Sequence, residues 1–244
     1  MIALLSLCVL LTAAPASSAP VTLKAGLAPP GDEVSLVLTG IAVPSRSEAG
    51  LYLFGRLSAA SASLRALLLR STDGGAHWRE VLPEVEHSEV LSVHFMGCQG
   101  RALVGWITEG PGELSLFAST DCGATWKRRS TLPKAVWSEW WEQVAWSDAR
   151  RGTVWLSDTA EENTPPRALA TQDGGRTWRP LPEPPPPPAP EPALVAQGPS
   201  GVRWTLVQDA RTSRLERREG EAVEVRASIP TSWRRRGNAL VPSP

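Results

Sequence analysis

Candidate binding chemistry is concentrated in one short segment near the middle of the chain. This segment alternates indole rings with carboxylates, at Trp137, Glu139, Trp140, Trp141 and Glu142. Indole rings stack on sugars, and tryptophan is enriched among the residues that dominate protein–protein binding. We therefore take these five residues as a candidate binding cluster for a protein partner or an extracellular glycan. At least one of Trp140 and Trp141 is instead expected to pack between structural elements.

Glycoside hydrolysis would require a pair of carboxylates. The two groups would lie about 5–5.5 Å apart in a retaining enzyme and about 6.5–9.5 Å apart in an inverting one. The acidic residues that could supply such a pair are Glu109, Glu113, Glu139, Glu142 and Asp158. Acidic side chains in loops are ordinarily solvated, so hydrolysis is an alternative to binding and not the main expectation.

Other reaction classes receive little support from the sequence. The three histidines, His77, His87 and His94, lack the short spacing of a zinc site. The chain has neither a glycine-rich phosphate loop nor a G-x-S-x-G motif. We expect no metal and no cofactor. The formal net charge is zero, with 25 basic and 25 acidic residues, which argues against nucleic-acid binding because that function needs a basic surface.

A repeat indicates the elements that must position these residues. Three segments, 71–78, 119–126 and 171–178, obey the pattern [S/T]-x-D-x-G-x-x-W. An aspartate can accept backbone N–H bonds within its own turn, and glycine adopts the positive φ that such turns need. The tryptophan then buries its ring beneath the turn, so each segment predicts a hairpin turn. The defining residues are Ser71, Asp73, Gly75, Trp78, Ser119, Asp121, Gly123, Trp126, Thr171, Asp173, Gly175 and Trp178.

These segments resemble Asp-box (BNR) repeats, which occur in sialidase-like β-propellers and in related photosystem-assembly and sortilin-type propellers. The resemblance implies an all-β fold, a small β-propeller of about four to five four-stranded blades. It also implies that each Asp box joins the third and fourth strands of a blade, on the face away from the active site. Sialidase activity is not expected, because the Arg-Ile-Pro-type motif is missing and the single tyrosine, Tyr52, lies in a predicted strand.

The predicted propeller domain covers residues 20–244. Its blades are expected at about residues 33–83, 88–133, 140–182 and 193–228, with Trp106, Trp155 and Trp204 in equivalent second strands. Segments 21–27 and 232–241 are expected to be extra strands that close the ring. Segment 183–192 is nearly all proline, which predicts a stiff polyproline-like connection between the third and fourth blades.

The N-terminus predicts export of the chain. The apolar run 2–13 is followed by small residues up to Ala19, which is typical of a secretory signal peptide covering residues 1–19. The mature chain has no further apolar run of membrane length, so it is expected to be secreted or periplasmic without a membrane span. It retains two cysteines, Cys98 and Cys122, which the propeller arrangement puts in two turns on one face of the second blade. We therefore expect a disulfide between them.

Together these features predict an exported, non-enzymatic β-propeller that serves as a protein-interaction or assembly module. The alternative is a carbohydrate-binding or glycoside-hydrolase-like protein that acts on extracellular glycans.

Overall fold

A computed structural model of the chain describes residues 21–44, 50–60, 62–105, 113–133, 140–157, 167–189 and 194–243. These residues form strands joined by turns, so the fold is all-β as predicted. In this part of the chain there is no helix of the length and apolar character that crossing a membrane requires. The predicted signal peptide, residues 1–19, lies outside the described residues and stays a prediction.

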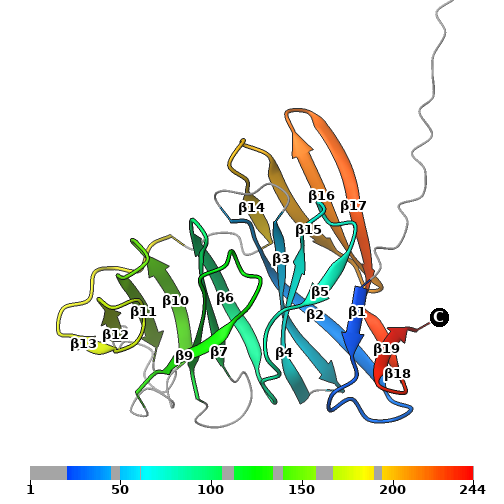
Figure 1. Cartoon of the computed structure of the whole chain (residues 1–244), viewed down its shortest axis with the longest axis horizontal. Helices are drawn as coiled ribbons and strands as arrows, with labels where there is room; N and C mark the ends of the chain where they lie inside the picture. Colours follow the sequence, from blue (N-terminus) through cyan, green and yellow to red (C-terminus); the bar gives the residue numbers. More distant parts are fainter. Residues whose placement is uncertain are drawn as a thin grey trace, which may run out of the picture.

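The strands form four sheets that follow one another along the chain (Figure 1). Sheet 1 contains β2 (Glu33–Ala42), β3 (Leu51–Ala59), β4 (Ala62–Ser71) and β5 (Trp78–Glu80). Sheet 2 contains β6 (Glu89–Met96), β7 (Gln99–Gly105), β8 (Ser115–Ser119) and β9 (Lys127–Thr131). Sheet 3 contains β10 (Trp140–Trp146), β11 (Gly152–Ser157), β12 (Arg167–Thr171) and β13 (Arg179–Leu181). Sheet 4 contains β14 (Val195–Gln197), β15 (Arg203–Gln208), β16 (Thr212–Glu219) and β17 (Ala222–Pro230). Each is an antiparallel meander.

Sheet 1 differs from the predicted blade because three further strands join it. These are β1 (Val21–Lys24), β18 (Ser232–Arg236) and β19 (Ala239–Pro242). Strand β18 pairs with β2, and β1 pairs with both β19 and β5, so the seven strands form a closed barrel. The terminal strands were expected to close a ring of blades, but they close sheet 1 on itself. The physical reason is that this closure pairs both edges of the sheet and buries Leu23, Trp233 and Leu240 in its interior.

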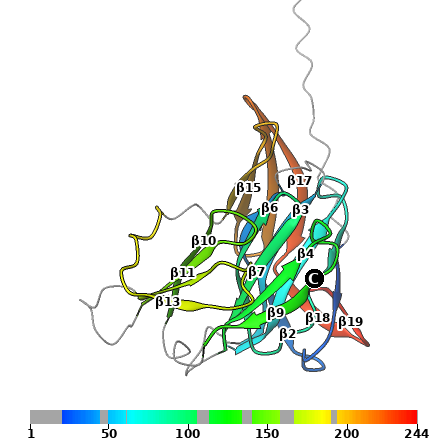
Figure 2. The ribbon, with the colours of Figure 1, turned by 60° about the vertical axis from the view of Figure 1, so that its left-hand side comes forward.

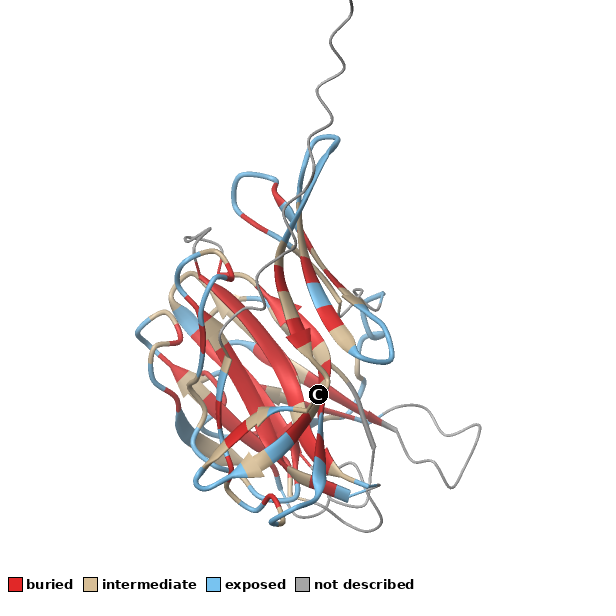
Figure 3. Cartoon of the chain, turned by 90° about the vertical axis from the view of Figure 1, so that its right-hand side faces the viewer, coloured by how far each residue is buried: buried red, intermediate tan, exposed pale blue. Residues whose placement is uncertain are grey.

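Three apolar clusters show the order in which the sheets pack. One fills the barrel and its contact with sheet 4, and it contains Leu53, Trp204 and Trp233. A second lies between sheets 1 and 2, and a third between sheets 2 and 3. The order is therefore sheet 4, sheet 1, sheet 2, sheet 3, and the strand interiors along it are buried while the turns are exposed (Figure 3). No apolar cluster of the described residues joins sheet 3 to sheet 4, so the stack is open at that point.

Candidate functional site

The three repeat turns share one hydrogen-bond arrangement. The hydroxyls of Ser71, Ser119 and Thr171 each donate to the aspartate two residues on, at 2.7–2.9 Å, and each accepts the N–H of the glycine four residues on at 2.8 Å. The aspartates accept the backbone N–H of the residue four positions later. Because these carboxylates are occupied in capping their own turns, their roles are structural.

The hydrogen bonds keep the three aspartates ionised. Desolvation raises the pKa of Asp73, but bonds from His77 and Ser71 outweigh it and lower that pKa to about 2. The side-chain and backbone bonds from Thr125 lower the pKa of Asp121, and the backbone bond from Thr177 lowers the pKa of Asp173. Each turn therefore carries a fixed negative charge at neutral pH.

Each repeat turn also packs against the preceding sheet. In the first turn Gly74 O accepts a bond from Arg226 of sheet 4. In the second, Cys122 O accepts a bond from the hydroxyl of Tyr52 in sheet 1. In the third, Gly175 O accepts a bond from Ser130 of sheet 2. The turns thus fasten neighbouring sheets together, and they do so at regular positions along the stack.

The second turn contains the predicted disulfide. Cys98, in the turn between β6 and β7, is bonded to Cys122, in the turn between β8 and β9. Cys122 has a φ of 54°, where the first and third turns have Gly74 and Gly174 with φ of 67° and 75°. The disulfide thus holds a non-glycine residue in the left-handed region.

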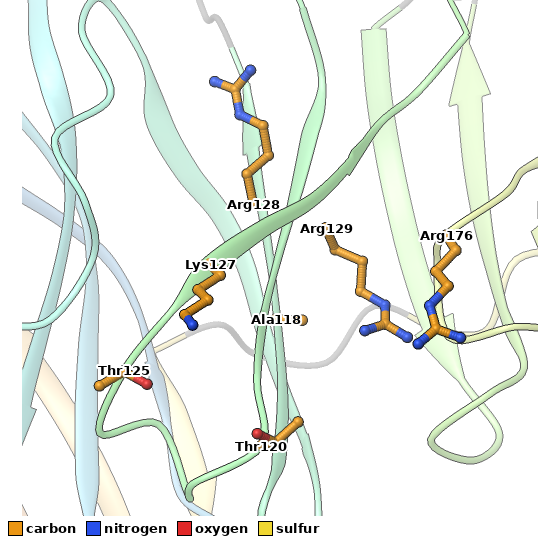
Figure 4. A pocket seen from close by; sticks show the side chains of 7 residues that line it. All are labelled: Ala118, Thr120, Thr125, Lys127, Arg128, Arg129 and Arg176. Atoms are coloured by element: carbon orange, nitrogen blue, oxygen red, sulfur yellow. The ribbon is translucent and has the colours of Figure 1, made fainter.

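A cationic pocket, the arginine pocket, lies between the second and third repeat turns (Figure 4). It has a volume of about 370 Å³. Its lining residues are Ala118, Thr120, Thr125, Lys127, Arg128, Arg129 and Arg176. The guanidinium groups of Arg129 and Arg176 lie side by side, whereas Arg128 points away from them (Figure 4). Arg128 pairs with Glu113 at 2.9 Å, so the pocket's own positive charge comes from Lys127, Arg129 and Arg176.

Arg101 adds a buried positive charge behind this pocket. It extends from β7 towards the third repeat turn, where Gly174 lies against its guanidinium and that of Arg129. Arg101 is only 2% exposed, and its guanidinium donates to Gly100 O and to Ala149 O at 2.8 and 2.9 Å. Desolvation, with a smaller contribution from the charge of Arg129, lowers the pKa of Arg101 from 12.5 to about 10. The positive charge is therefore held there at a free-energy cost.

The carboxylate of Asp173 acts on Arg129 of this group of cations through space and not through an ion pair. Among the described residues, no ion pair joins Arg101, Lys127, Arg129 or Arg176 to an acidic side chain. The Nε atoms of Arg101 and Arg129 are buried and have no hydrogen-bond partner. Desolvation and the neighbouring Arg176 lower the pKa of Arg129, and only the nearby Asp173 raises it. Buried charges are normally paired, so this arrangement favours binding of an anion.

The predicted binding cluster is only partly described. Trp137 and Glu139 lie outside the described residues, as do Trp106, Glu109 and Asp158. Trp140, Trp141 and Glu142 belong to β10, and the backbones of the two tryptophans pair with Ser157 and Leu156. Their role in binding stays a prediction.

The candidate carboxylate Glu113 has a structural environment. Its Oε1 accepts bonds from Ser115 at 2.7 Å, from Arg128 at 2.9 Å and from Thr131 at 3.1 Å. These contacts make it the acidic half of a surface ion pair. Across the described ranges, no three His, Cys, Asp or Glu side chains are grouped as metal ligands.

Sequence reasoning missed the arginine pocket. Two signals were available: the run 127–129 that directly follows the second repeat, and Arg176 at a variable position of the third. Consecutive repeats stack in space, so these two positions converge although they are far apart in the chain. The pocket also lies beside the repeat turns, whereas the family resemblance implies a functional face on the opposite side.

Comparison with known proteins finds solved structures that match the chain at low sequence identity and low TM-score. No protein-family model matches the chain, and no curated protein matches it. Among solved structures, YCF48 bound to a D1 peptide is 17% identical with a TM-score of 0.41, over 85% of this chain and 58% of that one. The GH74 enzyme of Niastella koreensis is 15% identical with a TM-score of 0.35, over 77% and 30%.

A third similar structure is the α-L-arabinofuranosidase Arb93A of Fusarium graminearum. It is 13% identical with a TM-score of 0.39, over 85% of this chain and 82% of that one. All three are β-propeller proteins. The chain spans little more than half of YCF48 and under a third of the GH74 enzyme. At these values the likenesses assign neither a family nor an activity.

Proposed function

We propose that this protein is a non-enzymatic binding module of the Asp-box β-propeller type that recognises an anionic group on a protein partner. The observation that carries the proposal is the set of unpaired cations at the arginine pocket. Arg101 is buried without an acidic partner among the described residues, and Arg129 and Arg176 lie side by side at the pocket. An anion between Arg129 and Arg176 would relieve the repulsion between these two groups.

The lining of the pocket favours binding over catalysis. It consists of guanidinium, ammonium, hydroxyl and methyl groups, which donate hydrogen bonds or make apolar contacts. Arginine forks match the geometry of carboxylate, phosphate and sulfate oxygens. None of the lining groups ordinarily exchanges a proton near neutral pH.

The size of the pocket favours part of a larger molecule over a free ion. Its volume of about 370 Å³ lies within the range of sites that enclose organic ligands. An acidic side chain or chain terminus, with its neighbouring residues, is a suitable occupant. Acidic glycans carry the same anionic groups, so they belong among the probes. Of the candidate carboxylates for hydrolysis, the structure describes the side chain of Glu113, and this side chain is engaged with Arg128.

We also propose that the protein acts outside the cytoplasm. The apolar run 2–13 supports export, and the Cys98–Cys122 disulfide supports an oxidising compartment. The Asp-box assignment is supported by the common hydrogen bonds of the three turns.

Calorimetric titration with four probes tests the proposed function: sodium sulfate, sodium phosphate, a Glu-rich peptide and a heparin oligosaccharide. We expect the peptide to bind most tightly and its affinity to fall as salt rises. The double variant Arg129→Gln/Arg176→Gln should lose about a hundredfold or more in affinity, because bonds to charged groups contribute roughly 1.5–3 kcal/mol each and two arginines are removed. The matched control is Arg128→Gln, since Arg128 points away from the other two arginines and pairs with Glu113.

The outcomes separate the alternatives. Unchanged peptide affinity in Arg129→Gln/Arg176→Gln, or an equal loss in Arg128→Gln, would contradict the assignment of the pocket. Tighter binding of the heparin oligosaccharide than of the peptide would replace the protein partner with an acidic glycan.

A further inference from the structure

A second site lies at the open end of the stack, on the face of sheet 3 that turns away from sheet 2. Trp155 of β11 is on this face and is only 4% exposed. Neither Trp155 nor its buried neighbour across the ladder, Ala168, belongs to any of the three apolar clusters. These two side chains are therefore buried by something other than a neighbouring sheet.

The covering element is the proline-rich segment that follows β13. The indole N–H of Trp155 donates to Pro185 O at 2.9 Å. Pro185 lies four positions after Leu181, the end of β13. At about 3.1 Å per residue a polyproline helix of that length covers about 12 Å, enough to cross from the outer strand to β11 at about 4.8 Å per strand. Figure 2 shows the segment leaving β13 and running beside β11.

No repeat turn of the described residues covers this face. A Cβ placed on Gly75 of the first turn would touch Leu215 of sheet 4, and one on Gly175 of the third would touch Leu116 of sheet 2, so these turns pack elsewhere in the stack. Sheet 4 packs on sheet 1, and its turn between β16 and β17 lacks the repeat residues. The proline-rich segment thus covers a face that the repeat turns leave open.

The chemistry of the contact is that of polyproline recognition. Segments of this kind dock on aromatic-lined grooves because their backbone is already extended and loses little entropy on binding. Their carbonyls have no partner within the helix, so an indole N–H is a suitable donor. The side chains of residues 185–188 remain exposed while Trp155 is buried. The segment therefore lies on the surface as a ligand would.

We propose that the Trp155 face of sheet 3 is a binding site for polyproline-II ligands, occupied in this structure by the chain's own residues 182–189. The intramolecular segment acts as a displaceable cap, and the site accepts the same sequence from a separate molecule once the cap is removed. This site is independent of the arginine pocket.

The test is to exchange the cap and supply it again as a peptide. In one variant, residues 183–188 are replaced by a Gly-Ser segment of equal length. The probe is a fluorescent peptide with the sequence of residues 182–189, and binding is followed by anisotropy. We expect the variant to bind the peptide and the unmodified chain to bind it about tenfold more weakly, because a tethered segment competes at an effective concentration near the millimolar range.

Substitution of the indole identifies the site. Trp155→Phe in the Gly-Ser background keeps an aromatic ring but removes the donor, so peptide affinity should fall about fivefold to tenfold. Trp204→Phe is the matched control, because Trp204 is a buried tryptophan of β15 in sheet 4 whose Nε1 has no partner. A folded Gly-Ser variant that fails to bind the peptide, or equal losses in Trp155→Phe and Trp204→Phe, would overturn the proposal.

An NMR measurement on the intact chain tests the same contact without the Gly-Ser replacement. The indole N–H signal of Trp155 is identified as the one missing from Trp155→Phe. We expect slow exchange of this proton with solvent and faster exchange in Pro185→Gly. Rapid exchange in the unmodified chain would show that the segment does not cover Trp155 and would overturn the proposal.

Discussion

Replacing Arg101 with methionine should leave the stability of the protein nearly unchanged while weakening its binding of anions. The pKa of Arg101 falls from 12.5 to about 10, mainly through desolvation, and this fall corresponds to roughly 3 kcal/mol of unfavourable free energy at pH 7. The substitution also removes the bonds to Gly100 O, Ala149 O and Gln99 Oε1, worth about 1 kcal/mol each, and the stacking of the guanidinium on the Trp146 ring at 5.5 Å. Methionine is long and flexible enough to fill the space. The favourable and unfavourable contributions of the guanidinium therefore cancel to within about 1 kcal/mol.

Urea unfolding followed by circular dichroism measures this difference. The midpoint should change little, and the denaturant slope should stay the same if the compactness of the two states is unaltered. Arg128→Met is the control, because its exposed ion pair with Glu113 should contribute less than about 1 kcal/mol. A loss of more than about 1 kcal/mol in Arg101→Met would show that the guanidinium is compensated where it lies. In that case the burial of Arg101 would give no support to an anion at the pocket.

Three further predictions concern the repeat turns. Gly123→Ala should lower the free energy of unfolding in urea by at least about 3 kcal/mol, because the new Cβ overlaps the ring of Tyr52. Gly201→Ala, with φ of 82° and open space, should lower it by only about 1 kcal/mol, and equal losses would refute the overlap. Removing the disulfide should lower the free energy of unfolding by about 3 kcal/mol. Cys98→Ser/Cys122→Gly should be about 1 kcal/mol more stable than Cys98→Ser/Cys122→Ser, because glycine accepts the φ of 54° at position 122, and the reverse order of stability would refute this. Asp73 has a pKa of about 2 in the folded chain in place of 3.8, so as the pH falls the unfolded chain takes up its proton first. The stabilisation from Asp73 is present above about pH 4 and should be lost towards pH 2. Asp73→Asn should flatten this dependence of the free energy of unfolding on pH, and parallel profiles for the two proteins would contradict it.

The strands were predictable because the repeat fixes their turns. The second repeat turn joins β8 to β9 and the third joins β12 to β13, which are the third and fourth strands of their sheets, as expected from the resemblance. A turn motif that specifies a hydrogen-bonded aspartate, a glycine and a buried indole leaves little freedom in where its flanking strands begin. The predicted disulfide followed from the same argument, since both cysteines lie in turns at one end of sheet 2.

Long-range pairing was not predictable in the same way. The terminal strands β1, β18 and β19 have the alternating pattern of strands, but nothing local shows whether they complete a ring or close sheet 1. Periodicity reports which face of a strand is buried, not which strand it pairs with. The arginine pocket was missed for a related reason, because it depends on how Arg129 and Arg176, on adjacent sheets, approach one another.

The two proposed sites follow from one structural rule and its failure. Where a repeat turn is present, it packs on the preceding sheet and brings its variable positions against that sheet, as Arg176 lies beside Arg129. A pocket between sheets is then a product of the stacking itself. Where the stack ends, at the outer face of sheet 3, no repeat turn of the described residues packs, and the hydrogen bond of the buried Trp155 to Pro185 O shows that the proline-rich segment lies there instead. Changes to the proline-rich segment should therefore leave the arginine pocket, between sheets 2 and 3, intact.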